Sequence, residues 1–523
     1  MAPWRWAWGV ALAASLVLPA RAADLAIAVG GAFTSMDPHF HDLTPNSALA
    51  AHVFDTLVQT DGAVKPIPGL AESWTAIDDR TWEFRLRRDV RFHDGTPFTA
   101  DDVVFTFGRV PTVPNSPASF GQYVRPVTRI EVVDAHTIRL HTAGPVPLIP
   151  VMMASPYIVS RRHGEGATTA DYNSGRAAVG TGPYRLASFA MNDRAVFTRN
   201  PGWFGPAQPW ERVTYRLIAN NSSRVAALQA GDVDAIDAVP TRDVAQLRRD
   251  PHLTIVTRAG TRLIYLYVDV NRPQTPFVVD TQGQPLAANP MRDLRVRRAL
   301  SMAINREGIA RNLMEGFAVP TGQLMAAGMT GHDPSIAVDG YDPDRARQLL
   351  AEAGYPNGFG LTLHAPNNRY VNDAALAQAI AQMWARIGVR TEVQAMPAAM
   401  FFARGVRDEY SISLTGWSSG TGEADTPLAT QIATPDPPRG RSTVIRQSHY
   451  ANPTVDAVID RALATIDTAA REALYREATR MAMADQAIIP IHHQVNVWAM
   501  RKGIDYAAGM QERTRAMEFR PAR

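Results

Sequence analysis

Two periods of hydrophobic residues alternate along the chain and predict a mixed α/β protein. In the segment TWEFRL, Trp82, Phe84 and Leu86 fall on one face of an extended chain and charged side chains on the other, which is typical of a half-buried antiparallel strand. Further β-type runs occur between 129 and 141, within a region rich in proline and glycine. These patterns predict a mainly antiparallel subdomain at 65–183.

Helical patterns with their own start and stop residues occupy much of the rest of the chain. The segments 221–231 and 342–354 each begin with an Asn or Asp cap, carry apolar residues on one face and end at glycine. A strand at 361–364, a polar loop and a helical stripe closed at Gly388 follow. Strand, loop and helix in this order are typical of an α/β layer.

Length and composition narrow the class of protein. A chain of 523 residues is too long for one compact core, and 46% hydrophobic with 20% charged residues is ordinary globular composition. Cysteine is absent, which excludes disulfides, thiolate metal sites, cysteine nucleophiles and a lipidated N-terminal cysteine. Because 53 basic and 50 acidic residues are scattered without a polybasic run, nucleic-acid binding has no electrostatic support.

The N-terminus, MAPWRWAWGVALAASLVLPARA, predicts a cleavable secretory signal at 1–22. It has an early arginine, an apolar stretch and the small-x-small triplet Ala20-Arg21-Ala22. The apolar stretch is shorter than the roughly 20 residues that span a bilayer, so an uncleaved membrane anchor is the weaker alternative. We expect a soluble periplasmic protein without a lipid anchor, and loss of the signal lowers the net charge of +3 to about +1.

Seven sequence blocks, in order and over nearly the whole mature chain, resemble the family 5 extracellular solute-binding proteins. That family comprises the dipeptide, oligopeptide, glutathione and nickel receptors of ABC importers. The segment GWSSGTGEAD at 416–425 is most similar to the dipeptide- and glutathione-binding branch. The blocks are GLAESW (69–74), TWEFRLRRDVRFHDGTPFTADDVVFTF (81–107), GTGPYRL (180–186), RNPGWFG (199–205), LQAGDVD (228–234), DLRVRRALSMAINREGI (293–309) and YDPDRARQLLAEAGYPNG (341–358).

The resemblance implies a fold, a division of the chain and partners. The implied fold is the α/β, two-lobed periplasmic-binding-protein fold of type II, in its large peptide-binding class, with an inserted antiparallel β-rich subdomain. It implies a monomer without a cofactor that hands its ligand to the membrane permease subunits of an ABC importer and their ATPases. The implied division is lobe I at 23–64, 184–268 and 491–523, the insertion at 65–183, and lobe II at 269–490.

A zwitterionic ligand leaves water only if both of its ends meet fixed opposite charges, because an unpaired buried charge is very costly. By position in the family pattern, Asp425 would pair with the α-amino group of the ligand, with Glu423 as the near alternative. Arg369, beside Tyr370, lies in the predicted loop after the strand at 361–364, and a guanidinium suits a carboxylate. Here the segment NNRYVND departs from the pattern of the dipeptide binders.

Other polar or aromatic residues are candidates for orienting the ligand. Trp417 could stack on a side chain or a peptide plane. The loop at 35–46 of the first lobe and the first predicted crossover between lobes offer hydrogen-bonding groups. These candidates are Ser35, Thr44, Asn46, Tyr265 and Asp269.

Three other functions stay open at this point. The motif GWSSG formally matches a nucleophile elbow at Ser418, but the residues after it cannot begin a helix at the serine, as a serine hydrolase requires. A nickel chelate or haem could involve His39 and His41 or the pair at 492–493, although adjacent strand histidines point to opposite faces. An opine would be a peptide-like alternative ligand. No phosphate-binding loop is visible, so ATP binding would belong to a partner.

Overall fold

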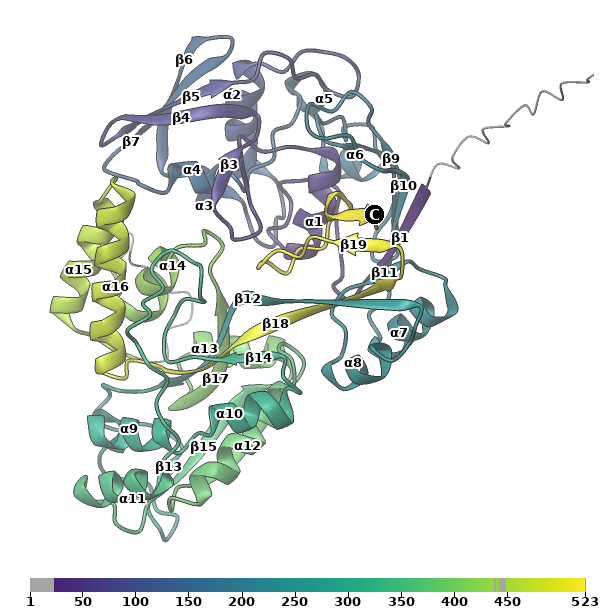
Figure 1. The fold of residues 1–523 in the computed structure, drawn as a ribbon. Coiled ribbons are helices and arrows are strands. Elements are labelled where there is room, and N and C mark those ends of the chain that lie inside the picture. Colours follow the sequence, from purple (N-terminus) through teal and green to yellow (C-terminus); the bar gives the residue numbers. More distant parts are fainter. Residues whose placement is uncertain (1–22, 437–438, 440, 442–447, 523) are drawn as a thin grey trace, which may run out of the picture.

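The computed structural model describes residues 23–436, 439, 441 and 448–522 (Figure 1). The predicted signal at 1–22 lies outside the described residues, and its cleavage stays a prediction.

A mixed sheet of 12 strands runs through the molecule in the order β13-β15-β17-β12-β18-β11-β1-β10-β9-β8, with β14 beside β18 and β16 beside β15. Its two central strands, β12 (Leu253–Val268) and β18 (Ile489–Arg501), are long and pair antiparallel. Figure 1 shows this pair crossing between two bodies of the molecule. On one side the sheet continues through β11 (Ala235–Ile236), β1 (Ala23–Val29), β10 (Trp210–Leu217), β9 (Arg194–Arg199) and β8 (Tyr184–Ala190).

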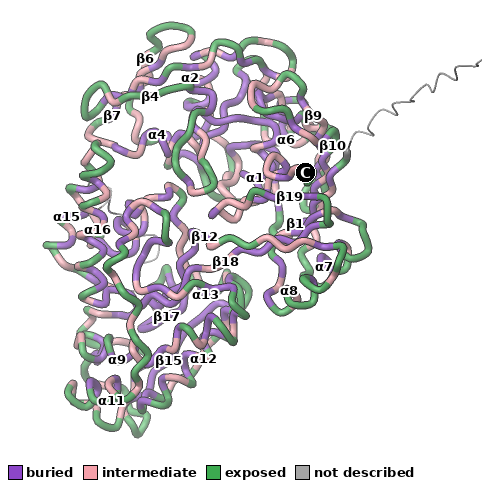
Figure 2. Tube along the Cα trace, in the orientation of Figure 1, coloured by how far each residue is buried: buried purple, intermediate pink, exposed green. Residues whose placement is uncertain are grey.

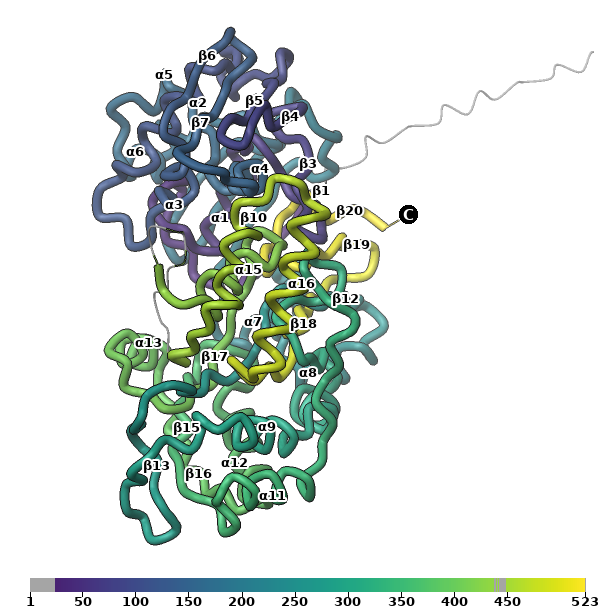
Figure 3. Tube along the Cα trace, turned by 90° about the vertical axis from the view of Figure 1, so that its left-hand side faces the viewer, coloured from purple at the N-terminus to yellow at the C-terminus, as the bar shows by residue number. Residues whose placement is uncertain are grey.

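The other side of the sheet carries the strands and helices of the chain from about 270 to 488. Its strands are β17 (Ile412–Ser418), β15 (Gly360–Pro366), β16 (Arg390–Met396), β13 (Val278–Val279) and β14 (Ala318–Pro320). Figure 2 shows β15 and β17 buried between more exposed helices, and Figure 3 shows α15 and α16 side by side. The helices are α9 (Leu294–Met302), α10 (Arg306–Gly308), α11 (Pro343–Glu352), α12 (Asp373–Ala385), α13 (Ala398–Val406), α14 (Asp425–Pro427), α15 (Pro453–Ala464) and α16 (Thr468–Ala484).

A separate four-stranded antiparallel sheet lies within the region predicted to be a β-rich subdomain. In its strand β5 (Thr81–Leu86), Trp82, Phe84 and Leu86 are buried and Arg85 is exposed, which confirms the predicted alternation. The other strands are β4 (Ala71–Asp78), β6 (Val127–Asp134) and β7 (Thr137–Thr142), and the helices beside them are α2 (Ala100–Arg109), α3 (Gly121–Val124), α4 (Ile149–Met152), α5 (Arg161–Gly164) and α6 (Thr169–Asn173).

The remaining elements lie between these bodies or complete the first one. The helices are α1 (Thr44–Val53), α7 (Asn221–Ala230) and α8 (Thr241–Leu247). Two short hairpins pair β2 (Val58–Thr60) with β3 (Pro66–Pro68) and β19 (Ile504–Tyr506) with β20 (Phe519–Pro521). The helix α7 is capped as predicted, because the Asn220 side chain accepts a hydrogen bond from the backbone N–H of Ser223, and Gly231 ends it with a φ of +83°.

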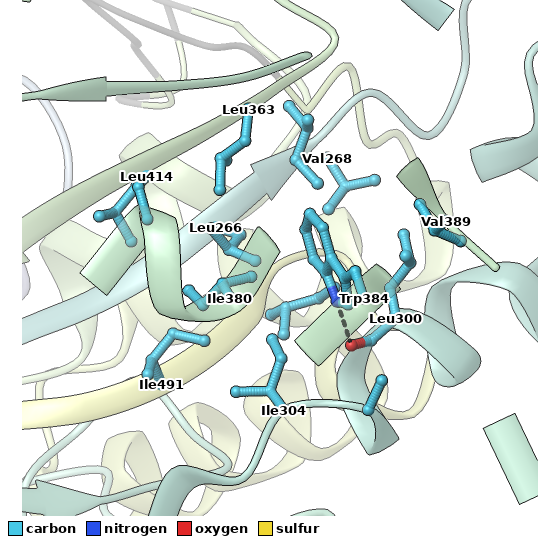
Figure 4. Close-up of a cluster of buried hydrophobic side chains, with 14 of the residues drawn as sticks. Leu266, Val268, Leu300, Ile304, Leu363, Ile380, Trp384, Val389, Leu414 and Ile491 are labelled. Carbon is cyan, nitrogen blue, oxygen red and sulfur yellow. Dashed lines mark hydrogen bonds between the residues drawn. The ribbon is translucent and has the colours of Figure 1, made fainter. Parts of the chain in front are cut away.

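Two hydrophobic cores lie toward opposite ends of the β12–β18 pair. Leu266 and Ile491 belong to one core, whereas Trp498 and Met500 belong to the other. The first core surrounds Trp384, whose indole N–H donates to the Leu300 carbonyl at 2.9 Å (Figure 4). Since burying one large apolar side chain contributes about 1.5–3 kcal/mol, each side of the molecule has a substantial core, and β12 and β18 connect them.

Candidate ligand-binding site

The carboxyl end of β17 meets β12 at a small pocket, whose lining includes Leu263 and Tyr265 of a third hydrophobic core. In this antiparallel pairing Trp417 lies opposite Leu263, and Ser418 lies opposite Arg262. The pocket has a volume of about 10 Å³, roughly enough for one water molecule. The buried indole nitrogen of Trp417 has no hydrogen-bond partner in the described part of the chain, so it is a donor available to a ligand. The lining residues are Thr261, Leu263, Tyr265, Leu324, Met325, Trp417, Ser419, Pro427, Gln431 and Ile488.

The two predicted acidic residues differ sharply in their surroundings. Glu423 forms a two-fold ion pair with Arg471, at 2.9 and 3.0 Å, and the Arg471 side chain is only 4% exposed. Asp425 is also buried, yet no described cation lies within ion-pairing distance of it, and its carboxylate accepts hydrogen bonds from Thr421 and Thr426. The structure therefore neutralises Glu423 and leaves Asp425 as the acidic group without a counter-charge.

Burial governs the protonation of Asp425. Removal from water raises the pKa of its carboxyl to about 6, the hydrogen bond from Thr421 opposes that rise, and the negative charge of Glu423 adds to it. A buried carboxylate with a raised pKa and without a cation favours an ammonium group as its partner, because the ammonium restores the lost charge stabilisation.

On the basic side of the site, one arginine is paired and its neighbour is not. Arg262 binds Glu512 through two hydrogen bonds of 2.7 and 2.9 Å. Arg369 has no ion pair among the described residues, and burial together with the nearby charge of Arg262 lowers its pKa. Both guanidinium groups lie over the ring of Tyr370, at 5.8 and 5.1 Å from its centre. Arg369 is therefore the cation free to bind a carboxylate.

The sequence did not reveal Arg262, Glu512 or Arg471. Each matters through a partner that is distant along the chain: 250 residues separate Arg262 from Glu512, and 48 separate Glu423 from Arg471. The only available signal was that Arg262 precedes the predicted crossover strand. Only the folded chain shows which charges are already paired.

The remaining predicted residues are spread over the molecule. The hydroxyl of Tyr265 lies at the pocket but donates to Gln431 at 2.9 Å. Asp269, at the end of β12, is buried in a network with Arg272, Thr275 and His449. The structure does not bring Ser35, Thr44 or Asn46 to the pocket: Ser35 binds Asn173, Asn46 binds Thr34, and Thr44 begins α1 at the surface.

The serine-hydrolase alternative gains no support from the geometry. The strand β17 ends at Ser418, and the next helix, α14, begins only at Asp425. In the described part of the chain, no histidine forms a hydrogen bond with Ser418.

The histidines give a similar result for metal binding. Both ring nitrogens of His39 have protein partners, the Tyr157 carbonyl at 2.7 Å and Arg109 at 2.8 Å. His492 and His493 are buried in β18, and burial lowers their pKa values to about 3 and about 4. Among residues 23–436, 439, 441 and 448–522, no group of three or more metal-ligating side chains of the His, Cys, Asp and Glu type comes together.

Within the same described ranges, no helix has the length and apolar character needed to cross a membrane.

Comparison with known proteins assigns the chain to a family. Residues 65–436 match the family model of the bacterial extracellular solute-binding proteins, family 5 Middle. The chain is 31% identical over 500 residues to the glutathione-binding protein GsiB of Shigella dysenteriae serotype 1, covering 92% of this chain and 90% of the relative.

Solved structures show the same fold. The Helicobacter pylori periplasmic binding protein DppA, in complex with the peptide STSA, has a TM-score of 0.75 at 24% identity, covering 95% of this chain and 98% of that one. HbpA2 from Haemophilus parasuis has a TM-score of 0.81 at 23% identity, covering 96% and 100%. The predicted α/β, two-lobed periplasmic-binding-protein fold is confirmed. The chain belongs to the family 5 bacterial extracellular solute-binding proteins.

Proposed function

We propose that this protein binds a short peptide or a peptide-like solute between two hinged lobes and delivers it to an ABC importer. The observation that carries the proposal is the set of unpaired charges: within the described ranges Asp425 and Arg369 form no ion pair, whereas the neighbouring Glu423 and Arg262 each form one. One free carboxylate and one free guanidinium complement the ammonium and carboxylate ends of a peptide. The names of the relatives, a glutathione-binding protein and a protein in complex with a peptide, support this class of ligand.

We infer that β12 and β18 are the hinge. Lobe I would comprise 23–64, 184–268 and 491–523, the insertion 65–183, and lobe II 269–490. The position of the two cores at opposite ends of the β12–β18 pair supports this division. A ligand that contacts both lobes stabilises the closed state, and it shifts the equilibrium only by its differential affinity for that state.

The partners and compartment follow from the same proposal. The protein would act as a monomer in the periplasm after removal of 1–22, and the membrane permease subunits, with their ATPases, would receive its ligand. It would act without catalysis and without a cofactor. The family assignment supports this role, since its relatives are extracellular solute-binding proteins.

Blocking each end of a dipeptide tests the proposal. Mass spectrometry of co-purifying ligands and a thermal-shift screen would first identify a dipeptide that binds. Calorimetry on the mature protein would then compare the affinity for this dipeptide with the affinities for its N-acetyl and C-terminal amide derivatives. We expect each blocked derivative to bind at least tenfold more weakly, because each loses a charge-assisted hydrogen bond worth about 1.5–3 kcal/mol. Equal affinity of the N-acetyl derivative would contradict the role of Asp425. Tight binding of a metal chelate or haem, without any peptide, would favour the alternative receptors.

A further inference from the structure

The turn between α15 and α16 contacts the antiparallel subdomain. Ile466, in this turn, is half-buried and packs against a hydrophobic core that includes Phe84, Ile138 and Ile149 of the subdomain. Figures 1 and 3 both show the turn at the edge of that subdomain. In the proposed division the turn belongs to lobe II and the subdomain is inserted into lobe I, so this apolar contact spans the two lobes.

A buried arginine near the start of α16 holds the turn. The Arg471 side chain is only 4% exposed, and its Nη1 donates to the carbonyls of Thr465 at 3.1 Å and Ile466 at 2.9 Å. The Asp467 side chain caps the same helix, since it accepts a hydrogen bond from the backbone N–H of Ala470 at 2.8 Å. Because both carbonyls belong to the turn, the guanidinium fixes the backbone that presents Ile466.

The same guanidinium binds the loop at 419–424, which precedes Asp425 and is called the ligand loop below. Its Nε and Nη2 donate to the two carboxylate oxygens of Glu423, at 2.9 and 3.0 Å. Nη2 also reaches the Thr468 hydroxyl at 3.5 Å. Together with the two carbonyls of the turn, these acceptors match the five N–H donors of a guanidinium.

Glu423 is connected in turn to Asp425. The Glu423 amide donates to the Thr421 hydroxyl at 3.3 Å, and that hydroxyl donates to the Asp425 carboxylate. The Ser419 hydroxyl donates to the Glu423 carbonyl at 2.8 Å. A continuous series of contacts therefore runs from Asp425 through Glu423 and Arg471 to Ile466.

We infer that Arg471 is a positioning residue that couples a ligand at Asp425 to an interlobe latch at Ile466. The inference rests on the proposed function, because Asp425 is the proposed anchor and the latch forms only when the two lobes are together. A ligand that orders the ligand loop also orders the turn, and the contact at Ile466 adds to the stability of the closed state. Because coupling between two sites is reciprocal, each contact strengthens the other by the same factor.

Distance measurements test the latch without any ligand. The chain has no cysteine, so Ala135→Cys on the subdomain and Ala473→Cys on α16, both exposed, would carry two spin labels. We expect Ile466→Ala to lower the ratio of closed to open protein about fivefold, because a partly buried apolar contact is lost from the closed state alone. The matched control is Leu474→Ala, which truncates a half-buried side chain of α16 that packs against the core of lobe II and should keep the ratio.

A double variant tests the coupling through Arg471. Arg471→Lys keeps the charge beside Glu423 but has its donors on a single nitrogen, so it cannot also hold the turn. We expect Arg471→Lys to lower the same ratio about fivefold and the further change Ile466→Ala to lower it by less than about twofold, because the latch is already released. Losses that simply add would overturn the role of Arg471. If Arg471→Lys does not fold, Glu423→Asp, which keeps the charge but shortens the other partner, takes its place with the same expectation.

Calorimetry and stopped-flow kinetics separate this inference from the proposed function. The probes are glutathione and the dipeptide that the screen identifies. We expect Ile466→Ala to bind the probe that the wild type binds about fivefold more weakly, mainly through faster dissociation, and Leu474→Ala to bind it as the wild type does. Equal affinity and equal distances in wild type and Ile466→Ala would overturn the latch while leaving peptide binding intact. If neither probe binds, the proposed function fails and the coupling to a ligand fails with it, whereas the distances still decide whether the latch exists.

Discussion

Asp425 and Glu423 are two residues apart along the chain, yet their environments give them different roles. Glu423 is neutralised by Arg471, so it holds the loop in place. Asp425 keeps a buried carboxylate that forms no ion pair with any residue the structure describes. The family pattern named both residues as candidates, and it could not choose between them because the deciding arginine lies on a different helix.

Replacement of Asp425 by asparagine should weaken ligand binding with little loss of fold stability. The amide keeps the shape of the carboxylate but removes the charge that attracts an ammonium, so we expect a loss of about 1.5–3 kcal/mol in binding free energy. The matched control is Glu423→Gln, which leaves Arg471 buried without its partner. That control should lower the free energy of unfolding by about 3–5 kcal/mol. Calorimetry and chemical unfolding measure the two effects, and unchanged affinity in Asp425→Asn would exclude this carboxylate as the anchor.

The affinity should also depend on pH through the same side chain. The pKa of Asp425 is raised to about 6 in the free protein, so the carboxylate is charged above that pH and becomes protonated as the pH falls through it. Affinity for an ammonium-bearing ligand should therefore be highest near pH 7.5 and fall below pH 6, by up to about tenfold per pH unit. Asp425→Asn should lose this dependence.

Asp55 is a second buried carboxyl whose pKa is raised to about 6, so the comparison with Asp425→Asn is needed to assign the effect. Measurements of ligand affinity from pH 5 to 8, on the wild type and on Asp425→Asn, would show which carboxyl causes the pH dependence. A fall in affinity that is the same in wild type and variant would place the titrating group elsewhere, at Asp55 or on the ligand.

At the scale of elements, the tip of the β2–β3 hairpin packs against the loop that precedes Asp425. Val64, at this tip, is 1% exposed and has a φ of +67°, which a β-branched residue rarely adopts. A Cβ atom on Gly422 would lie 2.8 Å from the Cβ of Val64, so the two backbones are in close contact. The Met510 amide also donates to the Gly62 carbonyl at 2.8 Å. The hairpin therefore packs against both the loop before Asp425 and the chain segment at Met510.

Val64→Gly should weaken ligand binding without unfolding the protein. Glycine adopts a positive φ without strain, while loss of the side chain removes an apolar contact with the ligand loop, which we expect to reduce affinity by about fivefold, or roughly 1 kcal/mol. The control Ile67→Ala removes an apolar side chain that is 37% exposed on the same hairpin. Calorimetry and thermal unfolding would report both variants. An equal effect of Ile67→Ala, or a lowered unfolding midpoint with unchanged affinity in Val64→Gly, would count against this role.

Much of the element structure could be predicted from the sequence, because local rules decide it. The caps at Asn220 and Asp342 and the alternation in β5 each depend on residues a few positions apart. The strand order of the main sheet does not follow from local rules, because β12 pairs with β18, which lies more than 200 positions away along the chain. Local patterns could not predict this pairing, because the two strands meet only in the folded chain.

At the scale of the whole molecule, the long β12–β18 pair explains how one continuous sheet contributes residues to two separate hydrophobic cores. Its ends belong to different cores, while the pocket at Trp417 is lined by Leu263 and Tyr265 of β12, which belong to a third core. The family resemblance named Asp425, Arg369, Tyr370 and Trp417 as candidates for contact with a ligand, and these remain predictions. It could not predict which charges remain free, because Glu512 and Arg471 reach the site only through the fold.

The crystal structure of the protein with a bound peptide tests the central claim most directly. The account predicts ligand density between the lobes, with the α-amino group within about 3 Å of the Asp425 carboxylate and a carboxylate at the Arg369 guanidinium. Ligand density elsewhere, or a bound peptide that leaves both Asp425 and Arg369 without contact, would contradict it.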